Sequence, residues 1–223
     1  MKNFYYFFLF AIILFYGFSC PTYIGFDGSE RYRIKGKIKD EKGNSMSNIE
    51  LALCGISNSV YFEDNTIQRC KSDQNGNFDL IFSKNNANIY YLKINYNSYN
   101  YNQKINENYA EKYVSFSPSR FIDYEYDISS HCSLVPGVEL NFVCDSIIDN
   151  YNYCYVYYQS PQDIDLDGKV YYDFYREIIV YEKSSSKIIV PKNSKIKFMI
   201  YANSKSYTDS IYVSDVPYTY KIK

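Results

Sequence analysis

The sequence predicts an all-β protein of two antiparallel β-sandwich domains that follow an N-terminal signal segment. Three observations carry this prediction. Apolar and polar residues alternate with a period of two along many short segments. Turn residues such as Gly, Asn and Asp separate these segments, and no long stretch predicts a helix. Tyrosine, with 29 copies against no tryptophan, is frequent in the alternating segments, where aromatic and β-branched side chains fit a pleated surface.

Residues 1–19 have the pattern of an export signal. Lys2 gives a positive start, and Phe4 to Tyr16 is an unbroken apolar run of thirteen residues. A span of the ~30 Å hydrocarbon core needs about 20 residues. A charged start, a short apolar middle and small residues before a cleavage point are instead typical of a removable signal peptide.

The segment Gly17-Phe18-Ser19-Cys20 resembles the lipobox of bacterial lipoproteins, with Phe18 where a small residue is commoner. In that family the cysteine carries a diacylglycerol and the preceding peptide is removed. The resemblance implies lipidation at Cys20 and attachment to a membrane of the bacterial cell envelope, periplasmic or surface-exposed. Two or three acyl chains anchor a protein stably. The alternative is an ordinary secreted protein in which Cys20 is free or disulfide-bonded. Residues 20–31 are expected to form a short tether.

The charge balance restricts the class of partner. The chain has 24 basic and 25 acidic residues, and removal of the signal takes away only Lys2. Nucleic-acid binding needs a strongly basic face, so we expect no nucleic-acid partner. The expected partners are the membrane, through the lipid anchor, and an unidentified protein or glycan.

The first domain is expected to span residues 32–128. Its predicted strands lie at Tyr32–Lys39, Ile49–Leu53, Ile67–Ser72, Phe78–Phe82, Ile89–Tyr96, Tyr113–Phe116 and Ile122–Ile128. Asn75-Gly76 accepts positive φ angles, and the segment from Asp73 to Gly76 therefore predicts a β-hairpin.

Several motifs in this domain resemble the carboxypeptidase regulatory-like domain, a transthyretin-like β-sandwich with a carbohydrate-binding-like fold. They are Gly36-x-Ile38-x-Asp40-x-x-Gly43, Ile49-x-Leu51 and Ser72-Asp73-x-Asn75-Gly76-x-Phe78-x-Leu80. The resemblance implies a structural or ligand-binding role and no catalytic residues. Because sandwiches carry many unrelated functions, it says little about the ligand.

The second domain is expected to span residues 130–223 and resembles no family. Its predicted strands lie at Val138–Cys144, Cys154–Tyr158, Val170–Tyr181, Ile188–Pro191, Ile196–Ala202, Ile211–Val213 and Tyr218–Ile222. No sequence repeat relates the two halves, and we predict a second antiparallel sandwich.

A calcium site is one hypothesis for the second domain. Asp163, Asp165 and Asp167 alternate and are followed by Gly168, as in the first half of a calcium loop, with Asp173 near the position of the last ligand. The alternative is a solvated acidic turn between two strands.

A tyrosine- and asparagine-rich loop is a second candidate site. Tyr96, Tyr99 and Tyr101 combine flat apolar rings with hydroxyl groups, as in binding loops, and the same rings stack on sugars. The alternative is a surface turn in a sequence rich in both residue types.

The cysteines predict a disulfide rather than a catalytic or zinc site. Export permits disulfides, and we expect Cys54 to pair with Cys70. The pairing of the remaining thiols, Cys132, Cys144 and Cys154, stays open. The only histidine, His131, adjoins Cys132, but the spacings lack the knuckle of a zinc site.

Together these features predict a non-enzymatic, membrane-anchored envelope lipoprotein with a role in surface binding, adhesion or structure. The alternative is a carbohydrate-binding lipoprotein assisted by calcium. We expect no cofactor otherwise.

Overall fold

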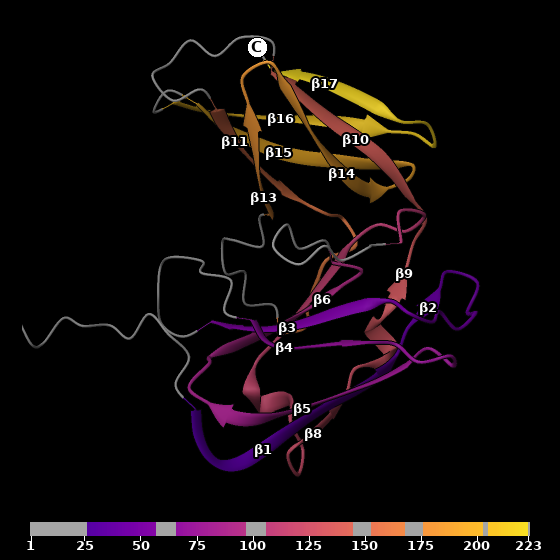
Figure 1. Ribbon diagram of the computed structural model, residues 1–223, viewed down its shortest axis with the longest axis vertical. Coiled ribbons are helices and arrows are strands. Elements are labelled where there is room, and N and C mark those ends of the chain that lie inside the picture. The colour runs from indigo at the N-terminus through magenta and orange to yellow at the C-terminus, as the bar shows by residue number, and fades with distance from the viewer. Residues whose placement is uncertain are drawn as a thin grey trace, which may run out of the picture.

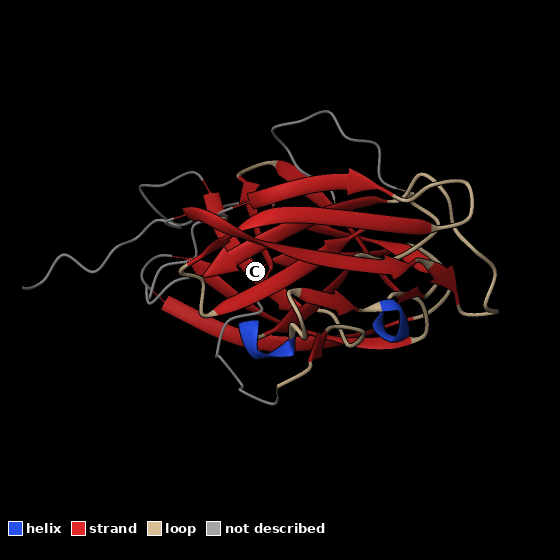
Figure 2. Cartoon of the chain, turned by 90° about the horizontal axis from the view of Figure 1, so that it is seen from below, coloured by secondary structure: helices blue, strands red, loops and turns tan. Residues whose placement is uncertain are grey.

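The computed structural model describes residues 26–56, 66–96, 106–144, 153–167, 176–202 and 205–222. These residues form strands and two single-turn 3-10 helices, which confirms the all-β prediction. The strands gather into two bodies, β1–β9 in one and β10–β17 in the other, except for the short strand β12 (Figure 1). Seen from below, the sheets lie in layers with both 3-10 helices at the periphery (Figure 2). No helix among the described residues is long and apolar enough to cross a membrane.

The first sandwich packs a three-stranded sheet on a five-stranded one. The smaller sheet has the order β5-β1-β8, formed by β5 (Asn77–Asn85), β1 (Phe26–Lys37) and β8 (Glu125–Asp127). The larger has the order β12-β7-β6-β3-β4, formed by β12 (Ile164–Asp165), β7 (Lys112–Phe116), β6 (Ile89–Ile94), β3 (Glu50–Ile56) and β4 (Thr66–Lys71).

The core of this sandwich follows the alternation in the sequence. Ile34 and Leu80 face Leu53, Leu92 and Val114 of the other sheet, and all five are fully buried. Burying one such side chain contributes about 1.5–3 kcal/mol, so the alternation decides which face of each strand turns inward.

The first core extends beyond the predicted boundary at residue 128. Strand β9 (Ser133–Leu134) pairs with β2 (Lys39–Asp40), and Cys132 and Leu134 belong to the first core. The 3-10 helices η1 (Pro118–Arg120) and η2 (Ser129–His131) flank β8 in the chain. The change of domain therefore falls at Val135 to Gly137.

The hairpin predicted at Asp73 to Gly76 is wrong. Strand β4 pairs with β3, whereas β5 pairs with β1, so this turn carries the chain from one sheet to the other. The turn itself is as expected: the Asp73 carboxylate accepts the backbone N–H groups of Asn75 and Asn77. Gly76 has φ of +80°, and an added Cβ would lie 2.6 Å from the Ile38 carbonyl oxygen.

The second sandwich is also built from two sheets. One has the order β14-β10-β17, formed by β14 (Ser184–Pro191), β10 (Gly137–Cys144) and β17 (Tyr218–Ile222). The other has the order β13-β11-β15-β16, formed by β13 (Arg176–Tyr181), β11 (Tyr153–Gln159), β15 (Ser194–Ala202) and β16 (Lys205–Val213).

The two sandwiches share one topology. The two-residue strands β2, β9 and β12 are left out of this count. In each sandwich the fourth, first and seventh strands then form a three-stranded sheet, β5-β1-β8 or β14-β10-β17. The third, second, fifth and sixth lie side by side in the other sheet, β4-β3-β6-β7 or β13-β11-β15-β16. The first and seventh strands pair in parallel in both, β1 with β8 and β10 with β17. Most other pairs are antiparallel, as predicted. The structure thus contains a repeat that the sequence does not reveal, and β12 is an addition to it.

Candidate functional site

The segment with alternating aspartates joins the two sandwiches. It leaves the second sandwich after β11 and adds β12 to the free edge of β7 in the first, with Ile164 opposite Val114 and Asp165 opposite Ser115. The Leu166 N–H donates to the Ser115 carbonyl at 3.0 Å. Ile164 and Leu166 also pack against the first core. A strand of the second half of the chain therefore completes a sheet of the first.

The three aspartates form a ladder along β7. Asp163 accepts the backbone N–H of Tyr113 at 2.8 Å, and Asp165 accepts the Ser115 hydroxyl at 3.1 Å. Asp167 accepts the backbone N–H of Ser117 and the Arg120 Nε at 2.8 Å. The alternation of the aspartates matches the alternation of their partners on β7, because both segments are extended. Hydrogen bonds to a charged acceptor contribute about 1.5–3 kcal/mol each.

This geometry changes the interpretation of the calcium motif. Each described aspartate directs an oxygen to a different residue along β7 and the segment that follows it. No three acidic, histidine or cysteine side chains in the described part of the chain converge as metal ligands. Asp173 lies outside the described residues, so calcium binding by the whole loop stays a prediction.

The contact between the two sandwiches, here called the seam, is formed by β12 and its three aspartates against β7, together with Arg176. Arg176 belongs to β13 of the second sandwich. Its side chain is 4% exposed, and its Nη2 donates to Asp163 Oδ1 at 2.8 Å and to the Glu111 carbonyl at 3.2 Å. The guanidinium lies 4.0 Å from the centre of the Tyr113 ring and 5.4 Å from that of Tyr158. A cation over an aromatic face is most favourable when both are shielded from water.

The two partners of the buried ion pair both have raised pKa values, for different reasons. Burial lowers the pKa of Arg176, but the Asp163 carboxylate and its neighbours more than offset this, and the pKa is raised. Burial raises the pKa of Asp163 although Arg176 opposes the shift. Arg176 therefore stays protonated, and burial makes Asp163 the partner whose charge is more costly to maintain.

The linker between the sandwiches contributes a second set of contacts. Gly137 N–H donates to the Asn108 carbonyl at 2.8 Å, and Ala110 N–H donates to the Val135 carbonyl at 3.1 Å. A Cβ on Gly137 would lie 2.8 Å from the Ala110 nitrogen. The chain therefore enters the second sandwich in close contact with the first.

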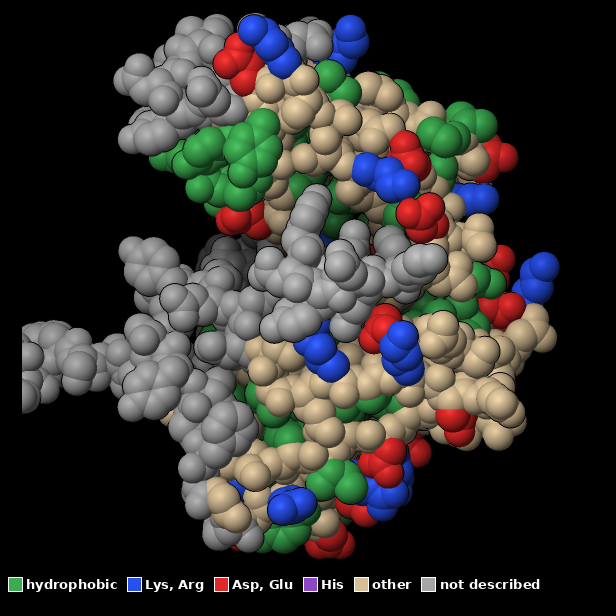
Figure 3. Space-filling model, viewed as in Figure 1, with side chains coloured by type: hydrophobic (Ala, Val, Ile, Leu, Met, Phe, Trp, Pro, Cys, Tyr) green, Lys and Arg blue, Asp and Glu red, His purple; other side chains and the backbone are tan. Residues whose placement is uncertain are grey.

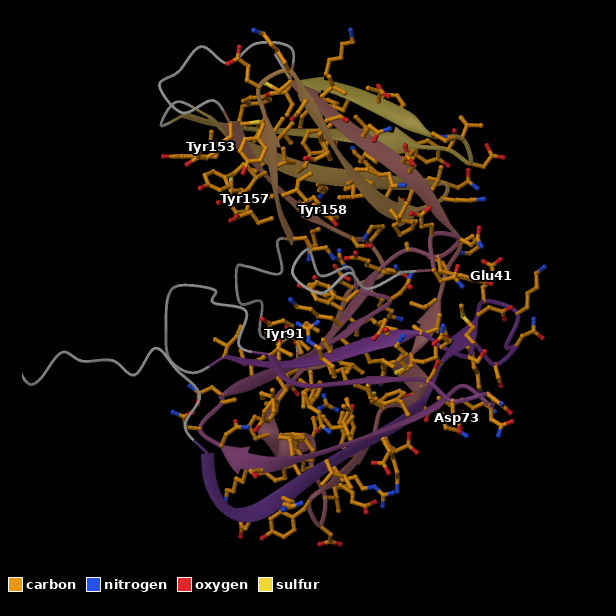
Figure 4. The ribbon with its side chains drawn as sticks, viewed as in Figure 1. Glu41, Asp73, Tyr91, Tyr153, Tyr157 and Tyr158 are labelled. Carbon is orange, nitrogen blue, oxygen red and sulfur yellow. The ribbon has the colours of Figure 1, made fainter. Side chains whose placement is uncertain are left out.

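Tyr96 is held within the first sandwich and its ring is not free. It is half-buried, and the Lys93 ammonium lies 4.2 Å from its ring centre. The same ammonium lies 5.5 Å from the ring of Tyr91 and 5.4 Å from that of Tyr113. Tyr91 and Tyr113 occupy the outward positions of β6 and β7 in the larger sheet, and Tyr91 is labelled there in Figure 4. Tyr99 and Tyr101, predicted to bind with Tyr96, lie outside the described residues, as does Cys20.

The predicted disulfide between Cys54 and Cys70 is wrong, because neither cysteine forms a disulfide in the structure. Cys70 lies opposite Leu51 and Cys54 lies opposite Thr66 across β3 and β4. The two thiols are therefore offset along the strands by about three positions, about 10 Å, which is too far for a disulfide.

The thiol beside His131 is unsuited to nucleophilic catalysis. Cys132 is fully buried, and its Sγ donates to the Ile128 carbonyl at 3.3 Å. Burial raises the pKa of Cys132 to about 12. A nucleophilic cysteine needs the opposite shift.

The second sandwich carries a surface that the sequence motifs did not indicate. The outer side of the sheet β13-β11-β15 carries a cluster of seven residues, here called the tyrosine face: Tyr153, Tyr155, Tyr157, Ile179, Tyr181, Met199 and Tyr201. Gln159, Glu177 and Lys197 continue this side of the sheet beyond the cluster. Within it the Tyr153 and Tyr155 ring centres are 5.3 Å apart, and those of Tyr155 and Tyr157 are 6.1 Å apart. An apolar patch is visible on this side of the molecule (Figure 3), and the labelled Tyr153 and Tyr157 project from it (Figure 4).

The signal for this face was present in the strand alternation. Cys154, Val156 and Tyr158 occupy the inward positions of β11, as predicted, which leaves three tyrosines on the outward positions. An outward row of aromatic residues in place of polar ones is the departure that would have marked it.

No protein-family model and no curated protein sequence matches the chain. Among solved structures it is similar to the Bacillus anthracis TIE protein, with 12% identity, a TM-score of 0.31, 86% of this chain and 34% of that chain covered. It is also similar to the shaft pilin SpaA of Lactobacillus rhamnosus GG, a D295N mutant, with 8% identity, a TM-score of 0.33 and coverages of 85% and 96%. The major pilin subunit BcpA of Bacillus cereus shows 8% identity, a TM-score of 0.31 and coverages of 84% and 69%.

The chain therefore spans about a third of the length of the Bacillus anthracis protein. At these identities and scores the likeness concerns the all-β architecture alone. It carries no conclusion about activity, partner or assembly.

Proposed function

We propose that the chain is a non-enzymatic lipoprotein of the bacterial cell envelope that holds two joined β-sandwiches at a membrane surface for binding or structural support. The seam carries this proposal. Strand β12, the aspartate ladder and Arg176 connect the sandwiches through buried contacts. Such a connection suits a protein that presents a surface at a fixed position, because it restrains the hinge motion that a flexible linker would allow.

The anchor in this proposal is Cys20. Phe26, where the first strand begins, follows Cys20 by only six positions, with five residues between them. A chain of that length reaches about 20 Å at most. A lipid on Cys20 would therefore hold the first sandwich close to the membrane, with the second sandwich attached through the seam.

The absence of catalysis in this proposal rests on the chemistry of the described side chains. The buried thiol of Cys132 is kept protonated by its raised pKa, and Arg176, Asp163 and Glu111 are engaged with one another in the seam. The strongly shifted groups therefore serve packing, as they do in structural ion-pair networks.

Glycan binding remains the second candidate function. The loop predicted for it is only partly described, and Tyr96 already packs on Lys93. The tyrosine face of the second sandwich favours the same class of ligand at a different place, as argued below.

The proposal is tested by fractionation of cells that express the wild type and Cys20→Ser. We expect the wild type in the membrane pellet and Cys20→Ser in the soluble fraction, since the thioether to the lipid requires the thiol. Protease treatment of intact cells then separates a surface location from a periplasmic one. A wild-type protein that stays soluble, or a Cys20→Ser protein that stays membrane-bound, would refute the anchor.

A further inference from the structure

The seven side chains of the tyrosine face carry no formal charge; three of them are exposed and the other four are half-buried. Tyr181 is 57% exposed, Tyr201 is 42% exposed and Ile179 is 37% exposed. Contiguous exposed apolar surface on a soluble domain marks an interaction site more often than chance. The tyrosine face is therefore a candidate binding surface.

The corresponding face of the first sandwich is already covered. There Tyr91, Lys93 and Tyr113 on β6 and β7 are less than 10% exposed. The rings of Tyr91 and Tyr113 are in contact with cations of the same chain. The Lys93 ammonium lies over both rings, and the Arg176 guanidinium lies over Tyr113. Since the two sandwiches share one topology, equivalent sheet faces are closed in one and open in the other.

We propose that the tyrosine face binds an uncharged glycan chain by stacking sugar rings on its tyrosines. A sugar ring has an apolar C–H face and a rim of hydroxyl groups. Tyrosine offers the complement, an aromatic plane with a hydroxyl at its edge. Five of the seven side chains of the face are tyrosines, whereas a purely apolar partner would be matched by leucine, isoleucine and phenylalanine.

The arrangement of the rings suits a chain ligand. Tyr153, Tyr155 and Tyr157 alternate along one strand, which spaces them by about 6.6–6.8 Å. Tyr181 pairs with Tyr153 and Tyr201 pairs with Tyr155 across the neighbouring strands, which widens the row. Most of these tyrosines are fixed by sheet pairing on both sides, so little conformational entropy is lost on binding.

Charge and size argue against the other occupants. The exposed Glu177, which accepts a hydrogen bond from Tyr157, and the exposed Lys197 lie at the border of the face. Their opposite charges leave no excess positive charge for an anionic polysaccharide or an anionic membrane. A stable interface between two copies of the chain needs about 20–30 residues on each side, and the face has seven.

The test measures retention of the Cys20→Ser chain on cellulose, chitin, starch and mannan, with alginate as an anionic polysaccharide and phosphatidylglycerol vesicles as a lipid surface. We expect retention on at least one neutral polysaccharide. The double variant Tyr155→Ala/Tyr201→Ala should bind about tenfold more weakly, a loss of about 1.4 kcal/mol, because it removes two ring contacts with the glycan.

Matched controls exist on the same sandwich. Tyr218 is 43% exposed, like Tyr201, and Tyr212 is 64% exposed, like Tyr181, and both lie outside the tyrosine face. Tyr218→Ala and Tyr212→Ala should bind as the wild type does. Unchanged melting of all variants would show that the sandwich is intact.

Three results would overturn the inference. They are no retention on any neutral polysaccharide, equal retention of the double variant, and a tyrosine-dependent binding found only with alginate, with vesicles or as a dimer in gel filtration. Because the test uses a chain without lipid, glycan binding can fail while the proposed anchoring holds. Equally, the anchoring can fail while glycan binding holds.

Discussion

At the level of single residues, the seam depends most on the buried pair of Arg176 and Asp163. Both side chains are at most 5% exposed, so neither charge is compensated by water if its partner is removed. The pair need not stabilise the fold more than an apolar contact of the same shape would. It does make the two residues dependent on each other.

We expect Arg176→Ala and Asp163→Ala each to lower the free energy of unfolding by about 3 kcal/mol, because each leaves an uncompensated buried charge. The double variant should lose less than the sum of the two, as measured by urea denaturation. Lys183→Ala, whose side chain is 80% exposed beside Glu182, is the control and should change stability by no more than about 0.5 kcal/mol. Additive losses would contradict the pairing.

Alanine substitutions at two glycines in similar turns distinguish the cost of backbone strain from the cost of a steric contact. Gly76 and Gly43 both have positive φ, +80° and +85°. A Cβ on Gly43 meets nothing within 4 Å, whereas a Cβ on Gly76 meets the Ile38 carbonyl at 2.6 Å. Gly43→Ala should cost about 1 kcal/mol for the left-handed conformation, and Gly76→Ala should cost clearly more. Equal melting temperatures for the two variants would contradict the close contact.

Asp40 and Asp73 make these turns sensitive to acid. Each accepts hydrogen bonds from the residue four positions later, Asn44 or Asn77, and these bonds lower the pKa of each carboxyl. Both turns lie at one end of the first sandwich, near the labelled Glu41 and Asp73 (Figure 4).

A lowered folded-state pKa adds stability that is present above the unfolded pKa of about 3.9 and is lost as the pH falls through the folded value. Asp40→Asn/Asp73→Asn should therefore lose less stability than the wild type between pH 5 and about pH 3, because Asn keeps the turn without the titration. Parallel pH profiles in thermal melts would show that these carboxyls do not contribute.

At the level of elements, alternation along the chain predicted the strands and their inward faces. Ile34, Leu53 and Phe198 lie where the period of two placed them. Strand β12 could not be predicted in this way. Its two residues pair with a strand about fifty positions earlier, and alternating aspartates fit a strand ladder as well as half of a calcium loop.

The ladder and the calcium loop predict different responses to chelation. Asp167→Ala removes the acceptor of the Ser117 N–H and of Arg120, and we expect a loss of about 2 kcal/mol. The loss should be the same in EDTA as in millimolar calcium, and the wild-type melting temperature should not respond to EDTA. A calcium-dependent rise in wild-type melting temperature that disappears in Asp167→Ala would contradict the ladder and support the calcium loop.

The candidate sites were predicted less well than the strands. Tyr96 lies in a covered cluster because Lys93, near the end of β6, brings its ammonium to the tyrosine rings. Whether a sheet face is covered depends on segments distant in the sequence. For this reason alternation alone could not distinguish the covered face around Tyr91 from the open face around Tyr155.

At the level of the whole molecule, the chain is two copies of one topology that differ in how their outer faces are closed. The first sandwich receives β12 and Arg176 from the second, and the second leaves its tyrosine face open. The duplication could not be predicted, because strand order depends on pairing between distant segments and the two halves show no sequence repeat.

The central claim is that the seam makes one body of the two sandwiches. Backbone ¹⁵N relaxation of the Cys20→Ser chain tests it most directly, because it gives the rotational correlation time of each sandwich separately. We predict that the two sandwiches share one correlation time in the Cys20→Ser chain. After the further change Arg176→Ala we predict two different correlation times. Two different correlation times in the wild-type sequence would mean that the sandwiches tumble independently, and would contradict the account.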